Sequence, residues 1–220
     1  MAATKDNKKL ILWGPYTGLS TYDLATTVWT AVTLREPTIK NFWGKVSSAL
    51  DPTTGLIYFP EAANLGTGML VYDPATSTTS IVPTYPSTVL SFQASGYSFV
   101  WSELRKSFLF FGGTGYINNM TAFNQYMIEY QPSTYSWTRI IELAKHCMIP
   151  AYGGTKMVVF GGEQPRKSIP AEEENFSSAL YMLDVMTMNW TLLSEGEVAG
   201  RSSIACTVVG DNFVVWGEPK

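Results

Sequence analysis

The stretch LYMLDVMTMNWTLL, residues 180–193, decides the fold, because its central part returns three more times along the chain. The related segments are YDLATTVWTAV from Tyr22, YDPATSTTSIV from Tyr72 and YQPSTYSWTRI from Tyr130. Measured from Tyr22 through Tyr72 and Tyr130 to Leu183, the copies follow at intervals of 50, 58 and 53 residues. Self-similarity at a nearly constant spacing indicates an array of like structural units.

Each copy is typical of a β-hairpin. An alternating strand runs into an Asp/Gln-x-x-Thr turn, whose first side chain can bond its own backbone, and a second strand follows. That second strand carries Trp29, Trp137 or Trp190, and the second copy has Thr79 at the same place. We expect the indole to be buried in every unit that has one, which would contribute roughly 2–3 kcal/mol each.

Two further strands are predicted upstream of the hairpins. Short apolar runs that end close to glycine or proline predict the second strand of each unit, because they are too short for helices and suit strands buried on both faces. They are Leu10–Pro15, Leu56–Glu61, Phe108–Thr114, Met157–Glu163 and Phe213–Glu218. First strands are predicted at Lys45–Leu50, Tyr97–Glu103, His146–Tyr152 and Ser202–Val209.

A diglycine after the second strand, Tyr/Leu-Asp in the third and Trp in the fourth recur in register, and this pattern resembles the kelch repeat of β-propellers. The resemblance implies an all-β, kelch-type propeller of four-stranded antiparallel blades, about four to five in a single domain over residues 1–220. The repeat units span about 9–34, 43–83, 96–141 and 145–194, with a partial unit at 200–217. The residues that carry the repeat are Gly14, Tyr22, Trp29, Tyr72, Gly112, Gly113, Tyr130, Trp137, Gly161, Gly162, Asp184, Trp190 and Gly217. A β-sandwich with accidental repetition is the alternative.

The order of the predicted strands leaves the ends of the array open. When the strands of each unit are numbered 1 to 4, the chain supplies strands 2-3-4 first, then 1-2-3-4 three times, and then 1-2. The two ends of the chain therefore both supply a second strand. The chain is therefore expected to be part of a larger propeller, to close as five blades with incomplete terminal blades, or to form a homodimer through its open terminal blades. Unpaired edges favour pairing with another chain.

Composition narrows the class of protein. The chain is 45% hydrophobic and 15% charged, which argues against disorder. A net charge of −3 and a pI near 5.2 provide no basic field for nucleic acid. No apolar run approaches the length of a membrane span, and residues 1–13 do not resemble a signal peptide. The sequence as written therefore suggests the cytoplasm, while an excised secreted domain would look the same.

The predicted binding face carries the long, dissimilar loops that follow second and fourth strands, since binding residues concentrate on irregular loops held by a rigid scaffold. The candidate ligand- or partner-binding residues are Tyr85, Tyr116, Asn118, Phe123, Glu163, Arg166 and Glu173. The aromatic residues can equally belong to the core, Asn118 and Asn119 can be turn formers, and the charged run around Glu173 can be a solvated loop.

The inventory of reactive side chains argues against an enzyme. The chain has one histidine, His146, and two cysteines, Cys147 and Cys206, so no metal site or cofactor is predicted. Both thiols are expected to be free and buried, since neighbouring innermost strands seldom meet disulfide geometry. We expect a non-catalytic module that binds a protein or peptide; the alternative is a lectin-like propeller that binds a glycan or small ligand. Three Asn-x-Ser/Thr triplets, at Asn119, Asn175 and Asn189, give a weak argument for secretion.

Overall fold

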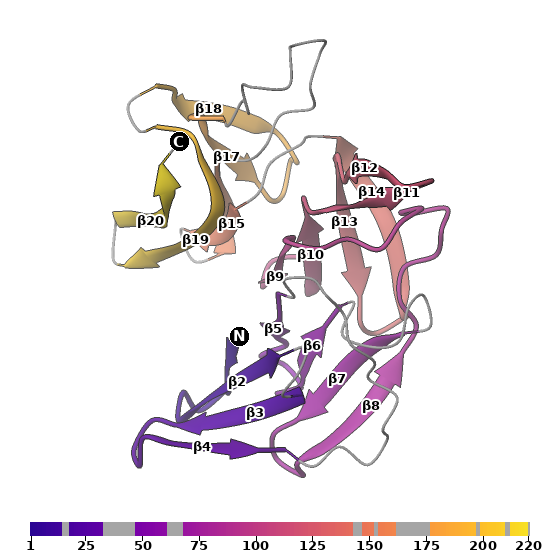
Figure 1. The fold of residues 1–220 in the computed structure, drawn as a ribbon, viewed down its shortest axis with the longest axis vertical. Coiled ribbons are helices and arrows are strands. Elements are labelled where there is room, and N and C mark those ends of the chain that lie inside the picture. The colour runs from indigo at the N-terminus through magenta and orange to yellow at the C-terminus, as the bar shows by residue number, and fades with distance from the viewer. Residues whose placement is uncertain are drawn as a thin grey trace. The chain divides into compact units, whose positions relative to one another are not determined.

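The computed structural model describes residues 1–14, 18–32, 47–60, 68–142, 147–151, 154–161, 177–196, 199–209 and 212–219. Its regular elements are strands, which form four four-stranded antiparallel sheets and two two-stranded ones (Figure 1). The strands group into two compact units, residues 1–95 and 96–220. Among the described residues, no helix is long and apolar enough to cross a membrane. The expected all-β fold of four-stranded, propeller-type blades is confirmed.

The first unit contains two blades. In the first blade, β1 (Ala2–Ala3), β2 (Lys9–Gly14), β3 (Gly18–Asp23) and β4 (Val28–Ala31) pair in chain order. In the second blade, β5 (Ala49–Leu50), β6 (Ile57–Phe59), β7 (Met69–Asp73) and β8 (Thr78–Val82) do the same. The prediction that the first blade begins with its second strand is wrong, because β1 supplies a first strand. The pairing of Ala2 with Ile11 was not predicted because two alanines carry no strand signal.

The second unit contains two more blades and two hairpins. β9 (Ser98–Ser102), β10 (Ser107–Phe111), β13 (Tyr126–Gln131) and β14 (Ser136–Glu142) form the third blade. β15 (Cys147–Ala151), β16 (Lys156–Phe160), β17 (Leu180–Asp184) and β18 (Trp190–Ser194) form the fourth. The hairpin of β11 (Thr114–Ile117) and β12 (Met120–Phe123) lies between the second and third strands of the third blade. β19 (Arg201–Val209) and β20 (Asn212–Pro219) form the last two-stranded sheet.

The repeated motif adopts one register in all four blades. The third-strand Tyr or Leu pairs with the fourth-strand Trp or Thr: Tyr22 with Trp29, Tyr72 with Thr79, Tyr130 with Trp137 and Leu183 with Trp190. The turn between these strands also repeats its backbone geometry. The residue four places after the turn's Asp or Gln has positive φ in each blade, namely 58° at Thr27, 56° at Ser77, 54° at Tyr135 and 55° at Met188. The eleven-residue pattern thus encodes a defined hairpin.

Aspartate side chains close three of these four turns. Asp23 accepts hydrogen bonds from the amides of Ala25 and Thr26, at 2.9 Å each, and Asp184 accepts two at 2.9 Å from the residues in the same places. Asp73 accepts one from the Ala75 amide at 2.8 Å. The predicted role of the motif's aspartate is confirmed: it satisfies turn amides that the strand ladder leaves without a partner.

Adjacent blades pack face against face within each unit. In the first unit, Ile11, Trp13 and Leu19 of the first blade cluster with Ile57, Phe59, Leu70 and Tyr72 of the second. In the second unit, Leu109, Phe111 and Met127 cluster with Met148, Met157, Val159 and Leu183. First strands also lie against first strands, β1 against β5, and β15 against both β9 and β19. Stacked sheets whose first strands converge are the geometry of neighbouring propeller blades.

Burial of the repeated tryptophan differs between blades. Trp137 is 8% exposed and Trp190 is half-buried, its ring centroid 6.0 Å from that of Phe111 in the preceding blade. Trp29 is 51% exposed. Its ring centroid nevertheless lies 4.9 Å from that of Tyr22, much as the ring centroids of Trp137 and Tyr130 lie 4.5 Å apart. The expectation that every unit buries its indole is therefore wrong for the first blade, because pairing within a blade covers only one side of the ring.

The expectation of free thiols is also wrong, because Cys206 of β19 is disulfide-bonded. The two strands that contain the chain's cysteines, β15 and β19, pack against each other as first strands of neighbouring sheets. Free thiols were expected because innermost strands of neighbouring blades seldom come close enough for a disulfide. In the second unit β15 and β19 lie against each other instead.

Candidate functional site

The β11–β12 hairpin belongs to the predicted binding face, because it follows β10, the second strand of the third blade. It leaves the third blade after Phe111, the last residue of β10, and returns at Tyr126, the first residue of β13. Asn118 and Asn119, with φ of 51° and 62°, form the two-residue turn at its tip. Positive φ at both central residues is the turn geometry that matches the twist of a two-residue hairpin, and asparagine tolerates it. The interpretation of these two asparagines as turn formers is confirmed.

The register of the hairpin brings two of the predicted binding residues together. Tyr116 pairs with Thr121, and Thr114 pairs with Phe123. Because directly opposed residues share a face and alternate residues along a strand share it too, all four side chains lie on one face. Tyr116 is 75% exposed and Phe123 is half-buried nearer the blade. This tyrosine face, as we call these four residues, offers an aromatic ring flanked by two hydroxyl groups.

The opposite face of the hairpin is apolar. Ile117 pairs with Met120 at the tip, and Gly115 pairs with Ala122 nearer the blade. Met120 is 67% exposed and Ile117 is 39% exposed. The hairpin therefore presents a mixed face and an apolar face, and both are open to solvent at the tip.

A buried asparagine fixes the base of the hairpin. Asn124 is 1% exposed; its Nδ2 donates to the Gly112 carbonyl at 3.0 Å and its Oδ1 accepts from the Tyr126 amide at 3.0 Å. Its own amide donates to the Gly113 carbonyl at 2.9 Å. Gly112 and Gly113 take φ of 70° and 95°, a region that other residues adopt only with strain. Asn124 was not predicted as a functional residue, because one asparagine in a long loop carries no periodic signal.

A cation–π contact adds to the support at the base. The Arg139 guanidinium of β14 lies 4.2 Å from the centroid of the Tyr126 ring. Such contacts contribute roughly 0.5–1 kcal/mol at accessible sites. The tyrosine face is thus held on a rigid scaffold, which lowers the entropy that ordering would cost when a ligand binds.

The other end of the third blade is closed by local polar contacts. Arg105, in the turn after β9, donates from Nε and a terminal nitrogen to the Glu129 carboxylate at 2.8 and 2.9 Å, and Ser107 donates to it at 2.5 Å. Burial raises the pKa of Glu129, but the hydrogen bonds from Arg105 and Ser107 outweigh it and hold the pKa below the usual range. The acceptors of this carboxylate are therefore engaged within the blade.

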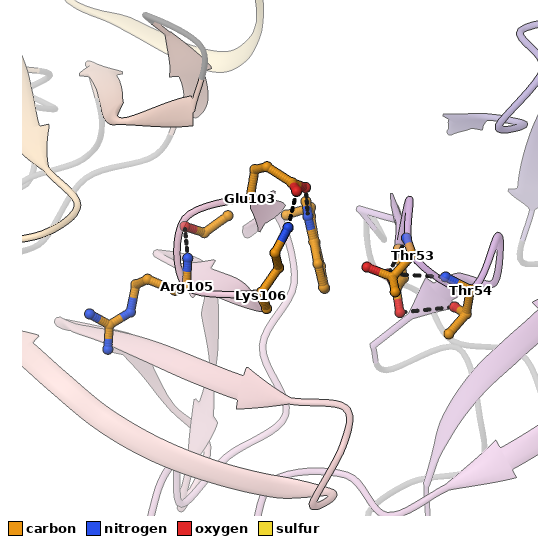
Figure 2. A network of polar contacts seen from close by, with 8 residues as sticks. Thr53, Thr54, Glu103, Arg105 and Lys106 are labelled. Carbon is orange, nitrogen blue, oxygen red and sulfur yellow. Dashed lines mark hydrogen bonds and ion pairs between the residues drawn. The ribbon is translucent and has the colours of Figure 1, made fainter.

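Two of the turns between first and second strands are closed in the same way (Figure 2). In the β9–β10 turn, Trp101 Nε1 donates to Glu103 at 2.8 Å, and Lys106 pairs with the same carboxylate. In the β5–β6 turn, Asp51 accepts from the Thr53 amide and the Thr54 hydroxyl, both at 2.8 Å. Polar groups in these turns satisfy one another, whereas the β11–β12 hairpin points its side chains to solvent.

The other predicted binding residues do not join this face. Tyr85 is 7% exposed; its hydroxyl donates to the Phe92 carbonyl at 3.2 Å and accepts from the Ala94 amide at 3.2 Å. A buried phenol with two such bonds stabilises the connection from β8 to β9 and leaves no open ring face for a ligand. Glu163, Arg166 and Glu173 lie outside the described residues, as does His146.

Comparisons with known proteins support the fold alone. No known protein family matches the sequence, and no curated protein matches it. The solved structure of YjhT is similar, with a TM-score of 0.59 and 18% sequence identity over 77% of this chain. The match covers 56% of the YjhT chain, so the chain spans a little over half the length of that neighbour. The likeness supports the propeller fold.

Proposed function

We propose that this protein is a non-catalytic recognition module of the kelch type, which binds a protein or peptide partner through the loops that follow second and fourth strands. The observation that carries this proposal is the β11–β12 hairpin. It holds a 75% exposed tyrosine on a rigid, hydrogen-bonded base at the end of a buried blade. Exposed aromatic residues on preorganised supports are typical anchors of protein interfaces.

The contrast between the two ends of the third blade supports the choice of this face. At the turn end, Glu129, Arg105 and Ser107 form bonds with one another, so few polar groups remain to recognise a partner. At the hairpin end, Tyr116 and Thr121 stand exposed side by side. A tyrosine next to hydroxyl groups combines apolar contact area with hydrogen bonding, which suits an extended peptide.

A peptide-display selection against the full chain tests the proposal. We expect selected peptides to lose at least tenfold in affinity with Tyr116→Ser, because truncating an aromatic anchor costs about 2 kcal/mol or more. Tyr135→Ser is the matched control, since Tyr135 is a 56% exposed tyrosine in the turn at the other end of β13. Peptides that bind both variants as tightly as the wild type would refute the assignment of the face.

A glycan or another small ligand is the second candidate, because the same exposed ring can stack on a sugar. A glycan array of the wild type and of Tyr116→Ser separates the two functions. Binding of defined sugars that disappears with Tyr116→Ser, together with no selected peptides, would replace the peptide proposal with the lectin-like one.

A further inference from the structure

We infer that Asn119, at the tip of the β11–β12 hairpin, is an acceptor for N-linked glycosylation. It begins the triplet Asn119-Met120-Thr121, in which the hydroxyl residue stands two places after the asparagine, as this modification requires. The inference rests on the geometry of the hairpin and on the disulfide of Cys206, and it does not depend on the proposed recognition function.

The tip of the hairpin has room for a bulky group. Residues 116–121 are all exposed, and β11 and β12 form a sheet of their own, with no third strand among the described residues. Asn119 lies in the turn between Ile117 and Met120, which pair with each other. An oligosaccharide at the end of such a hairpin extends into solvent without displacing a packed side chain.

The disulfide of Cys206 points independently to the compartment that this modification needs. Disulfides form and persist in oxidising environments such as the secretory route, and they are rare where thiols are kept reduced. Cys206 lies in β19, far along the sequence from the hairpin, and it is disulfide-bonded. An Asn-x-Thr triplet on an exposed tip and a disulfide are each expected of a chain that passes through that route.

The other two triplets do not carry the inference. Asn189 follows Met188, whose φ is 55°, and its carbonyl accepts a hydrogen bond from the Asp184 amide at 2.9 Å. Its neighbour Trp190 starts β18 and packs near Phe111. This triplet is part of the repeated hairpin that the blade needs. Asn175 lies outside the described residues.

The reaction is a group transfer from a lipid-linked oligosaccharide pyrophosphate. The side-chain amide nitrogen of Asn119 forms a bond to the anomeric carbon of the first sugar. The bond from that carbon to the pyrophosphate oxygen breaks, the lipid pyrophosphate leaves, and one amide proton passes to a base of the transferring enzyme. No oxidation or reduction takes place.

A sugar at this position would also cover an exposed apolar surface. Ile117 and Met120, which form the apolar face, are 39% and 67% exposed and stand two residues before and one residue after Asn119. Exposed apolar side chains on a hairpin with unpaired edges favour aggregation, and hydrophilic bulk close by opposes it. We therefore expect the glycosylated protein to be more soluble than the unmodified one.

The test is translation of the full chain behind a secretion leader in the presence of microsomes, with and without peptide N-glycosidase. Asn119→Gln and Thr121→Ala should each abolish the same glycosidase-sensitive mobility shift. Thr121→Ser and Asn118→Gln are the matched controls and should retain it, because the first keeps a hydroxyl and the second lies outside the triplet. Mass spectrometry should find aspartate at position 119 after enzymatic deglycosylation.

Two results would overturn the inference. The first is an unmodified residue 119 in wild-type protein from microsomes that glycosylate a reporter acceptor. The second is a free Cys206 in the lumenal protein, detected by thiol labelling after denaturation, because it would remove the argument for the compartment. Variants that misfold do not obscure these results, since both are read on the wild-type chain.

Discussion

Trp137 and Trp29 occupy the same place in the repeat, so replacing each by alanine measures what burial adds to a fixed motif. Their exposed fractions are 8% and 51%, which differ by 43 percentage points. An aromatic side chain of this size buries on the order of 200 Å², so the difference is roughly 85 Å². At about 25 cal/mol per Å², Trp137→Ala should cost about 2 kcal/mol more than Trp29→Ala.

The assay is urea unfolding followed by far-UV circular dichroism, which does not depend on the tryptophan removed. A full indole-to-alanine change in a core costs about 3–5 kcal/mol, so we expect Trp137→Ala to fall in that range. Trp137→Phe and Trp29→Phe are the conservative controls, and both should cost less than the alanine variants. Equal losses for the two alanine variants would refute the reasoning, because they would show that the open side of Trp29 is covered in solution.

Three further outcomes are expected. Thr27→Asn should raise the free energy of unfolding by about 1 kcal/mol, because Thr27 is β-branched and has φ of 58°, a backbone region that costs such residues most. The same change at Thr30, inside β4, should not stabilise the protein, and a loss of stability at both positions would contradict the turn geometry. Glu129 has a lowered pKa, so its contribution to stability is complete above the ordinary glutamate pKa and is lost as the pH falls through the pKa of the folded state. Glu129→Gln should therefore make the free energy of unfolding depend less on pH below about pH 4.5, and an unchanged dependence there would exclude this carboxylate as the cause. Analytical ultracentrifugation should detect self-association through the edge of β20, where Val214 and Trp216 are 44% and 80% exposed. Trp216→Lys should weaken the association and Tyr135→Lys should not, and a monomer at high protein concentration would refute this prediction.

The repeated motif made most of the blade architecture predictable. Tyr22, Tyr130 and Leu183 indicated not only hairpins but also their register, because the pairing with Trp29, Trp137 and Trp190 follows from a turn of constant length. Because the pattern recurs at nearly constant spacing, one copy that departs from it, such as the copy with Thr79 in place of tryptophan, does not hide the prediction. Local propensity alone would not have distinguished these hairpins from isolated ones.

Features that do not repeat were the ones that sequence reasoning missed. Nothing in Ala2–Ala3 signals a strand; β1 forms because β2 offers it a ladder. Tyr85 was a candidate binding residue with packing in the core as its alternative; it is buried, and its hydroxyl bonds to the backbone near Phe92, a contact that only the folded connection creates. Asn124 and the disulfide of Cys206 likewise depend on which backbones meet in space.

The β11–β12 hairpin is an insertion between β10 and β13, and its place in the third blade affects which changes of sequence the protein can tolerate. Phe111 and Met127 are paired across β10 and β13, so the insertion between them starts and ends at neighbouring points of a finished ladder. Doubling the length of such an insertion adds only about 0.6 kcal/mol of closure entropy. Foreign segments can therefore be grafted between Gly113 and Asn124 with little penalty to the blade, so a new binding loop at this position requires no change in the strands that hold it.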